Sequence, residues 1–172
     1  MRIFALAFVL FFMGGASSFL TAQPTGLEIG NKSPEIKLPT TQGDTISLFS
    51  LKGRLVLIDF WGTWCAPCLE EQAELARLYK KYKQVSSANG VGFEIYGVAL
   101  EAKKPNWENF ISKNKISWIQ VSDLKFWRSP VAKTYNIQGL PFNVLIDGKG
   151  VILAKNLHGP ELEKEIGKYL IK

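Results

Sequence analysis

The chain has 172 residues, 47% hydrophobic and 21% charged, with a formal charge of +6, two cysteines and one histidine. This length suits one domain of ordinary size with its own apolar core, and the composition is too ordinary for a disordered or fibrous chain. Two cysteines are too few for a disulfide-rich scaffold. With one histidine, they also cannot complete a four-ligand structural zinc site of the usual Cys/His kind.

The first 22 residues have the pattern of a secretory signal. Arg2 is their only charge, and it precedes an apolar run at 3–13 and small residues at 14–18. We expect cleavage after Ala22 or Ser18. The alternative is an uncleaved membrane anchor, because roughly 20 apolar residues can span a bilayer, although Gly, Ser and Thr dilute this stretch. Both interpretations predict an extracytoplasmic, potentially oxidising compartment for the remaining domain.

Hydrophobic patterning over residues 27–172 predicts alternating strands and helices without an internal repeat. A hairpin is expected at 36–38 and 45–48, followed by a strand at 55–61 whose nearly unbroken apolar run is typical of burial on both faces. The other predicted elements are helices at 65–82, 105–114, 131–135 and 161–171, strands at 93–100, 116–121, 142–146 and 151–157, and a polar loop at 84–90. This order predicts an α/β domain with a mixed central sheet, helices on both faces and a C-terminal antiparallel hairpin.

The helix predicted at 65–82 has its apolar residues in two adjacent stripes. The stripes contain Leu69, Ala73, Ala76 and Tyr79 in one and Leu75, Leu78 and Tyr82 in the other. We expect this helix to pack on the sheet through them.

Both cysteines lie in one CxxC motif, Cys65-Ala66-Pro67-Cys68, where the buried strand meets this helix. The free N–H groups and partial positive charge of a helix N-terminus favour a thiolate. Cys65 is therefore expected to attack, and Cys68, about one turn along, to resolve the mixed disulfide. Pro67 fits the first turn because it lacks an N–H.

Three other interpretations of the cysteine pair are compatible with a CxxC motif. A structural disulfide would contribute little, since a four-residue loop gives ~1.9 kcal/mol against ~3 kcal/mol for fifteen residues. A metal half-site lacks partners, because His158 lies far along the chain. Unrelated thiols are compatible with any lone CxxC, but the preceding buried strand and the export signal favour a redox pair.

The segment DFWGTWCAPC at 59–68 resembles the active-site stretch of thioredoxin-fold proteins. More narrowly, it resembles the TlpA/ResA-like family of extracytoplasmic thiol–disulfide oxidoreductases. Supporting segments are GNKSP at 30–34, LFSLKG at 48–53 and LPFNVLID at 140–147. The resemblance implies a thioredoxin-like fold with an N-terminal β-hairpin extension. LPFN replaces the small or hydroxyl residues usual around the late proline, which bears on the choice of partner.

The resemblance also implies a substrate-binding surface. Pro141 matches the family's cis-proline beside the disulfide, an assignment that rests on the resemblance because only ~5–6% of X–Pro bonds are cis. Leu140 would then present its backbone to a partner chain. Trp64, Ala66 and Pro67 are assigned to the same contact surface.

Two acidic residues are candidates for proton handling. A carboxylate inside an apolar strand is costly, so desolvation would raise the pKa of Asp59 and suit it to deprotonate Cys68. The alternative is a solvated or hydrogen-bonded strand-end aspartate. Glu71 lies three residues past Cys68 on the same helix face, and the resemblance implies that it tunes the cysteine pair. The alternative is an exposed acid like Glu70 and Glu74.

The remaining conspicuous residues are interpreted structurally. His158 is expected to be a surface residue, and the basic runs at 80–83 and 103–104 to be solvated. No nucleic-acid partner is expected, since these runs lack interleaved aromatics. The other tryptophans are interpreted as packing residues: Trp61, Trp107, Trp118 and Trp127.

The sequence thus predicts an enzyme that exchanges disulfides through Cys65–Cys68, with no other cofactor and no metal. The resemblance implies net reduction of exported proteins such as apocytochromes, with electrons from a membrane-bound thiol reductant; net oxidation would differ only in potential. A thiol peroxidase would need Thr and Pro ahead of a solitary cysteine, where this chain has WGTW at 61–64. A copper-binding or docking thioredoxin-like module would want another His or Met, and no Met follows residue 22.

Overall fold

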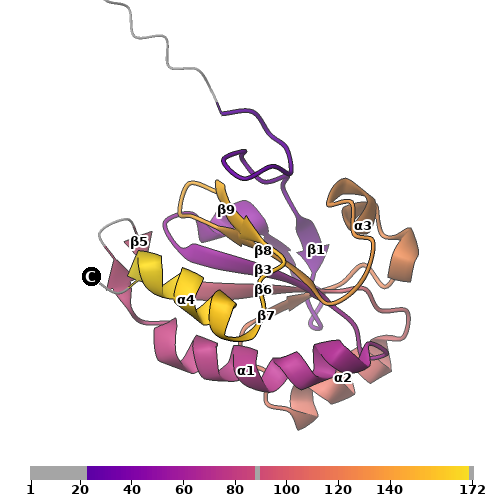
Figure 1. The fold of residues 1–172 in the computed structure, drawn as a ribbon. Helices are drawn as coiled ribbons and strands as arrows, with labels where there is room; N and C mark the ends of the chain where they lie inside the picture. The colour runs from indigo at the N-terminus through magenta and orange to yellow at the C-terminus, as the bar shows by residue number, and fades with distance from the viewer. Residues whose placement is uncertain (1–22, 88–89, 171–172) are drawn as a thin grey trace, which may run out of the picture.

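The computed structural model describes residues 23–87 and 90–170 and is built around a mixed five-stranded sheet (Figure 1). The strand order is β7-β6-β3-β8-β9, with β3 parallel to β6 on one side and antiparallel to β8 on the other. The strands are β3 (Leu55–Trp61), β6 (Phe93–Ala99), β7 (Ile119–Val121), β8 (Phe142–Ile146) and β9 (Ile152–Lys155). This is the mixed sheet with a C-terminal antiparallel hairpin that the sequence predicts.

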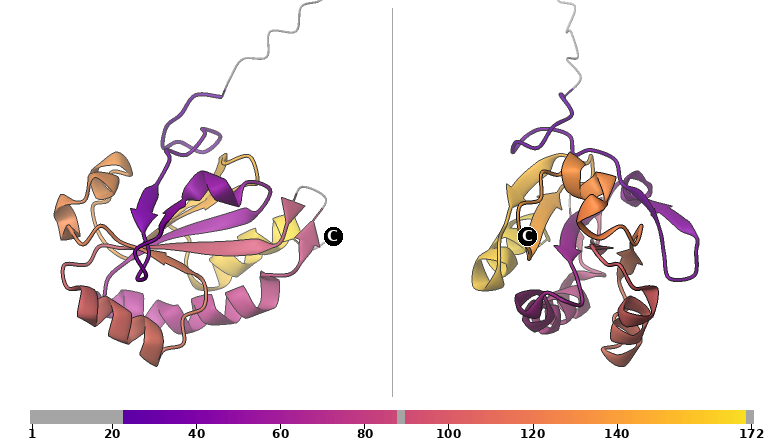
Figure 2. Two further views of the ribbon diagram at one scale, coloured as in Figure 1. Left: turned by 180° about the vertical axis from the view of Figure 1, so that it is seen from behind. Right: turned by 90° about the vertical axis from the view of Figure 1, so that its right-hand side faces the viewer.

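Helices cover both faces of the sheet, as predicted (Figures 1 and 2). One face packs against α1 (Ala66–Tyr82), α2 (Lys104–Lys113) and α4 (Gly159–Leu170). The other face is covered by α3 (Pro130–Thr134), the hairpin of β1 (Lys37–Pro39) and β2 (Thr45–Ser47), and a 3-10 turn, η1 (Leu48–Leu51).

Strand β3 is central, and all seven of its residues are buried. Its side chains alternate between two cores: Leu57 packs with residues of α1 and α4, whereas Ile58 and Phe60 face the α3 side. The ring of Phe60 lies 5.1 Å from that of Tyr135, which follows α3. Burial on both faces explains the unbroken apolar run and makes Asp59 the exception within it.

Several local predictions need correction. Ala73 and Ala76 are exposed, because α1 turns Cys68 and Gln72 toward the sheet instead. The segment 84–90, predicted as a polar loop, contains the short strand β4 (Ser86–Ser87) and the first residue of β5 (Gly90–Val91), and the two strands pair antiparallel. A further 3-10 turn, η2 (Phe126–Arg128), was not predicted.

The predicted export segment, residues 1–22, lies outside the described residues. Within the described part of the chain, no helix is long and apolar enough to cross a membrane.

Candidate active site

A tight loop carries the chain from β3 into α1, and Gly62 makes it possible. A Cβ on Gly62 would lie 2.6 Å from the indole nitrogen of Trp64 and 3.2 Å from the carbonyl oxygen of Leu100. The Trp64 Nε1–H donates to that same oxygen at 2.8 Å. A larger residue at position 62 would therefore displace the tryptophan that precedes Cys65.

The same loop is held by a buried carboxylate. Glu101, 3% exposed, follows the end of β6 and accepts hydrogen bonds from the backbone N–H and the hydroxyl of Thr63. It also accepts the N–H of Ala102, so both of its oxygens are hydrogen-bonded. The sequence pattern does not identify Glu101, since Glu101 and Thr63 lie 38 positions apart in the chain.

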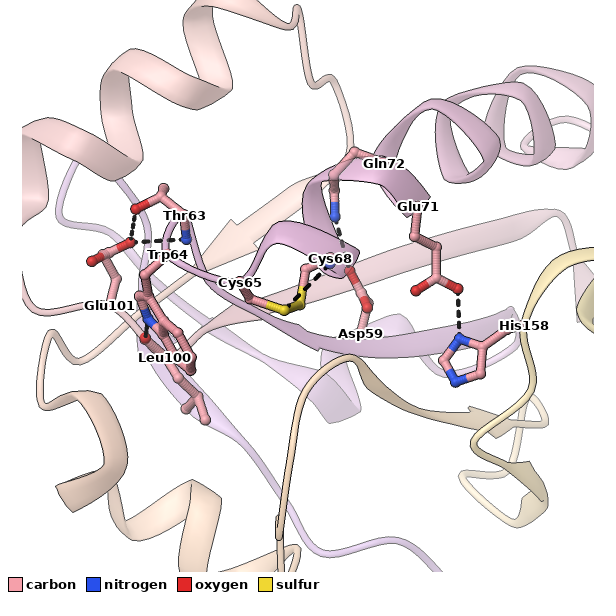
Figure 3. The surroundings of a disulfide bond; sticks show 10 residues. All are labelled: Asp59, Thr63, Trp64, Cys65, Cys68, Glu71, Gln72, Leu100, Glu101 and His158. Carbon is pink, nitrogen blue, oxygen red and sulfur yellow. Dashed lines mark hydrogen bonds and ion pairs between the residues drawn. A yellow bond between two sulfur atoms is a disulfide. The ribbon is translucent and has the colours of Figure 1, made fainter.

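Cys65 and Cys68 form a disulfide at the start of α1, with an S–S distance of 2.06 Å (Figure 3). Cys65 is the N-cap residue of α1, and its Sγ accepts the N–H of Cys68 at 3.3 Å. The exposed fraction is 5% for Cys65 and 1% for Cys68. These positions agree with the sequence prediction. Cys65 lies at the positive end of the helix dipole, and it is the more accessible of the two cysteines.

The segment before β8 closes the other side of the disulfide. The Leu140–Pro141 peptide bond is cis, and Leu140 packs against the cluster that contains both cysteines. Pro141 and Pro67 line one shallow depression with the first turns of α1. The family resemblance assigns Leu140, Pro141 and Pro67 to the substrate contact surface. The structure places these three residues around the cysteine pair.

Asp59 lies on β3 beneath Cys68 and is 2% exposed (Figure 3). Burial, and next the negative charge of Glu71, raise the pKa of Asp59 from 3.8 to about 7; a hydrogen bond from Gln72 opposes this rise. The Gln72 amide donates to the Asp59 carboxylate at 3.5 Å. A group that is half-protonated near neutral pH is suited to move a proton to and from a thiol.

Glu71 is not the exposed helix acid of the alternative interpretation. Its carboxylate, 12% exposed, pairs with the imidazole Nδ1 of His158 at 2.8 Å. His158 is therefore a partner of the site rather than a free surface residue. It is positioned by Asn143, which lies opposite Asp59 in β8 and bonds both the N–H and the carbonyl of Leu157.

The tryptophans divide between core and surface. Trp61, Trp107 and Trp118 are buried as predicted. Trp64 is 43% exposed beside the disulfide. Trp127 packs on Trp64 and Phe126 but is 38% exposed, so it is a surface residue rather than a core one.

Neighbouring side chains should shift the pKa of Asp59 in opposite directions. Glu71→Gln removes a negative charge and should lower that pKa, whereas Gln72→Leu removes a hydrogen-bond donor and should raise it. The measurement is an NMR titration of the Asp59 carboxyl carbon. Glu70→Gln is the matched control, because Glu70 is exposed and does not contribute to the Asp59 shift. An unchanged Asp59 titration in both variants would refute this electrostatic coupling.

Residues 29–155 match the protein family described as the AhpC/TSA family. The chain belongs to this family. The thiol–disulfide oxidoreductase ResA of Bacillus cereus (strain ATCC 10987 / NRS 248) is 32% identical over 184 residues, covering 99% of this chain and 96% of that protein. ResA of Bacillus subtilis (strain 168) is 32% identical over 141 residues, covering 82% and 73%.

Solved structures related to this AhpC/TSA member have the same fold. The C-terminal domain of a putative thiol-disulfide oxidoreductase from Bacteroides thetaiotaomicron aligns with a TM-score of 0.75 at 35% identity, covering 84% of this chain and 97% of that one. A putative thiol:disulfide interchange protein DsbE from Chlorobium tepidum gives 0.70 at 26% identity, covering 83% and 95%. The AhpC/TSA chain is a thioredoxin-like thiol–disulfide oxidoreductase, like these relatives, and its CxxC disulfide agrees with that activity.

Proposed function

We propose that the protein is an extracytoplasmic reductase that transfers two electrons from its cysteine pair to a disulfide of an exported partner protein. The observation that carries this proposal is the Cys65–Cys68 pair at the N-terminus of α1, with Asp59 buried beneath it. No cofactor beyond this cysteine pair is needed. A membrane-bound thiol reductant would return the electrons.

The first step uses the accessible sulfur of the reduced protein. The Cys65 thiolate attacks one sulfur of the partner's disulfide, so that a Cys65–partner S–S bond forms and the partner's own S–S bond breaks. The released partner thiolate takes up a proton. The helix N-terminus stabilises the attacking thiolate through its free N–H groups.

The second step uses the buried sulfur. Asp59 accepts the proton of Cys68, and the Cys68 thiolate attacks Sγ of Cys65. The Cys65–Cys68 bond forms, the mixed disulfide breaks, and the second partner thiolate takes up a proton. In total the partner gains two electrons and two protons, and the cysteine pair loses the same number.

Charge around the site supports the reducing direction. Stabilising the thiolate of a reduced pair makes that pair a stronger oxidant. Here the carboxylates of Asp59 and Glu71 lie on the Cys68 side, and Glu70 and Glu74 line the adjacent depression with Pro67. The negative charges of Glu70, Glu71 and Glu74, and of Asp59 in its ionised form, oppose a thiolate, which lowers the reduction potential and favours electron donation.

The direction is tested by the reduction potential of the cysteine pair, together with reduction of insulin in the presence of dithiothreitol. We expect a potential near or below about −250 mV, whereas a value near −120 mV would identify an oxidant. Cys65→Ser is the control and should have no insulin reductase activity. Wild-type protein that exchanges with no dithiol partner would contradict the proposed enzyme and leave a binding module.

The extracytoplasmic location is supported by the signal-like pattern of the first 22 residues. The test is the mass of the protein recovered from the exported fraction of a bacterial host. Loss of the segment ending at Ser18 or Ala22 would establish cleavage, and an intact mass in the membrane fraction would establish an anchor. Recovery from the cytoplasm alone would contradict export.

A further inference from the structure

Trp64, which adjoins the disulfide, shares one surface patch with two further aromatic rings. The centre of the Trp64 ring lies 4.9 Å from that of Phe126 and 5.8 Å from that of Trp127. The ring centres of Phe126 and Trp127 are 6.2 Å apart. Among the described residues, the exposed large hydrophobic side chains are Ile29, Trp64 and Trp127. We call Trp64, Phe126 and Trp127 the aromatic platform.

The backbone holds this platform in place at a conformational cost. Leu124 and Phe126 have φ angles of 56° and 55°, a region that residues with a side chain rarely occupy. The Phe126 N–H donates to the carbonyl of Glu101, and the Asp123 carboxylate accepts the N–H of Lys125 and the hydroxyl of Ser129. Rings that are fixed before binding lose little entropy when a partner arrives.

The platform adjoins the reactive sulfur. Trp64 immediately precedes Cys65, and Leu124, two residues before Phe126, packs against the cluster that contains both cysteines. A partner whose sulfur reaches Cys65 therefore brings its neighbouring residues onto the rings.

Exposed cations flank the platform residues in the sequence. Lys125 and Arg128 are exposed on either side of Phe126 and Trp127, and Lys103 is exposed two residues after Glu101. None of the ion pairs in the described part of the chain uses these three cations. The acidic residues of the same two segments are engaged elsewhere: Glu101 is buried and accepts hydrogen bonds from Thr63, and Asp123 is hydrogen-bonded within its own loop. The depression on the opposite side of the cysteine pair is acidic.

We propose that the aromatic platform selects polypeptide partners that carry an aromatic residue and acidic residues next to the reactive cysteine. This inference rests on the proposed disulfide exchange and adds a substrate class to it. The partner's aromatic side chain packs on the rings, and its carboxylates pair with Lys125 and Arg128. An anionic membrane surface would also suit tryptophans and cations, but contact there would cover Cys65 and block its access to a partner.

The test compares peptides that share one intramolecular disulfide and differ only beside the cysteine, carrying Phe with Glu, Phe with Lys, or Gly with Glu. Each kcat/KM is divided by that for hydroxyethyl disulfide, a small neutral disulfide. Wild-type protein should prefer the Phe/Glu peptide by about 10-fold over both others. Trp127→Ala should lose most of the aromatic preference. A Lys125→Glu/Arg128→Glu double variant should reverse the charge preference, and raised ionic strength should weaken it.

Ile29→Ala is the matched control, because it removes an exposed large hydrophobic side chain outside the platform and should keep the wild-type preferences. Equal rates for the three peptides, with normal reduction of hydroxyethyl disulfide, would overturn the inference and leave the proposed function standing. If the wild-type protein does not reduce hydroxyethyl disulfide at all, the result would count against the proposed function itself. Vesicle binding that Trp127→Ala abolishes, without peptide discrimination, would assign the platform to a membrane.

Discussion

A Cys68→Ser variant is expected to accumulate a covalent complex with a disulfide-containing partner, whereas Cys65→Ser should form none. Cys65 is the more exposed of the two cysteines and lies at the N-cap of α1, so it can reach a partner. Cys68, at 1% exposure, can reach only Cys65. Removing Cys68 therefore stops the reaction after the first exchange, and turnover should fall by at least ~10³-fold because an intramolecular attack is lost.

The complex is measured by mass spectrometry and non-reducing electrophoresis after mixing the reduced variant with insulin. The Cys65→Ser/Cys68→Ser double variant is the control for non-covalent binding, since the chain has only these two cysteines. Complex formation through Cys68 in the Cys65→Ser variant would show that the roles of the two sulfurs are reversed. Rapid turnover by Cys68→Ser would show that a partner thiol resolves the intermediate.

Local sequence patterns predict the elements of this fold well because local physics determines them. The apolar run at 55–61 becomes a strand buried on both faces, and the anomalous acid within it is the buried Asp59. The CxxC motif lies where a strand ends and a helix begins, and Cys65 caps that helix. These features depend on neighbouring residues and on the period of the pattern.

The parts that sequence analysis missed depend on contacts between distant segments. Glu71 and His158 lie 87 positions apart, and only the packing of α4 beside α1 brings them together. Tertiary packing also determines which face of α1 turns toward the sheet. Gln72 is buried against Asp59 and Ala73 is exposed, although the apolar pattern predicts that the alanine is the buried residue. Trp127 is exposed because its loop is anchored at Glu101, a constraint that hydrophobicity does not reveal.

Asp59→Asn should stabilise the folded protein while impairing its chemistry. Burial raises the pKa of Asp59 to about 7, so the folded state binds this proton more tightly than the unfolded state does. The contribution of Asp59 to the free energy of unfolding therefore falls as pH rises from about 4 to about 7, and stays low above that. Three pKa units correspond to ~4 kcal/mol, which Asn should recover near pH 8 and not near pH 4.

The turnover of Asp59→Asn should fall although its stability rises, because an amide cannot accept the proton of Cys68. We expect a loss of roughly 10²-fold near neutral pH, which shrinks at higher pH as Cys68 ionises without help. Guanidinium unfolding of the oxidised protein at both pH values, with insulin reduction across the same range, measures the two effects. Asp44→Asn is the matched control, since Asp44 is exposed in the hairpin turn. A pH-independent stability difference would show that Asp59 is not a buried titrating group, and unchanged turnover would remove it from the proton path.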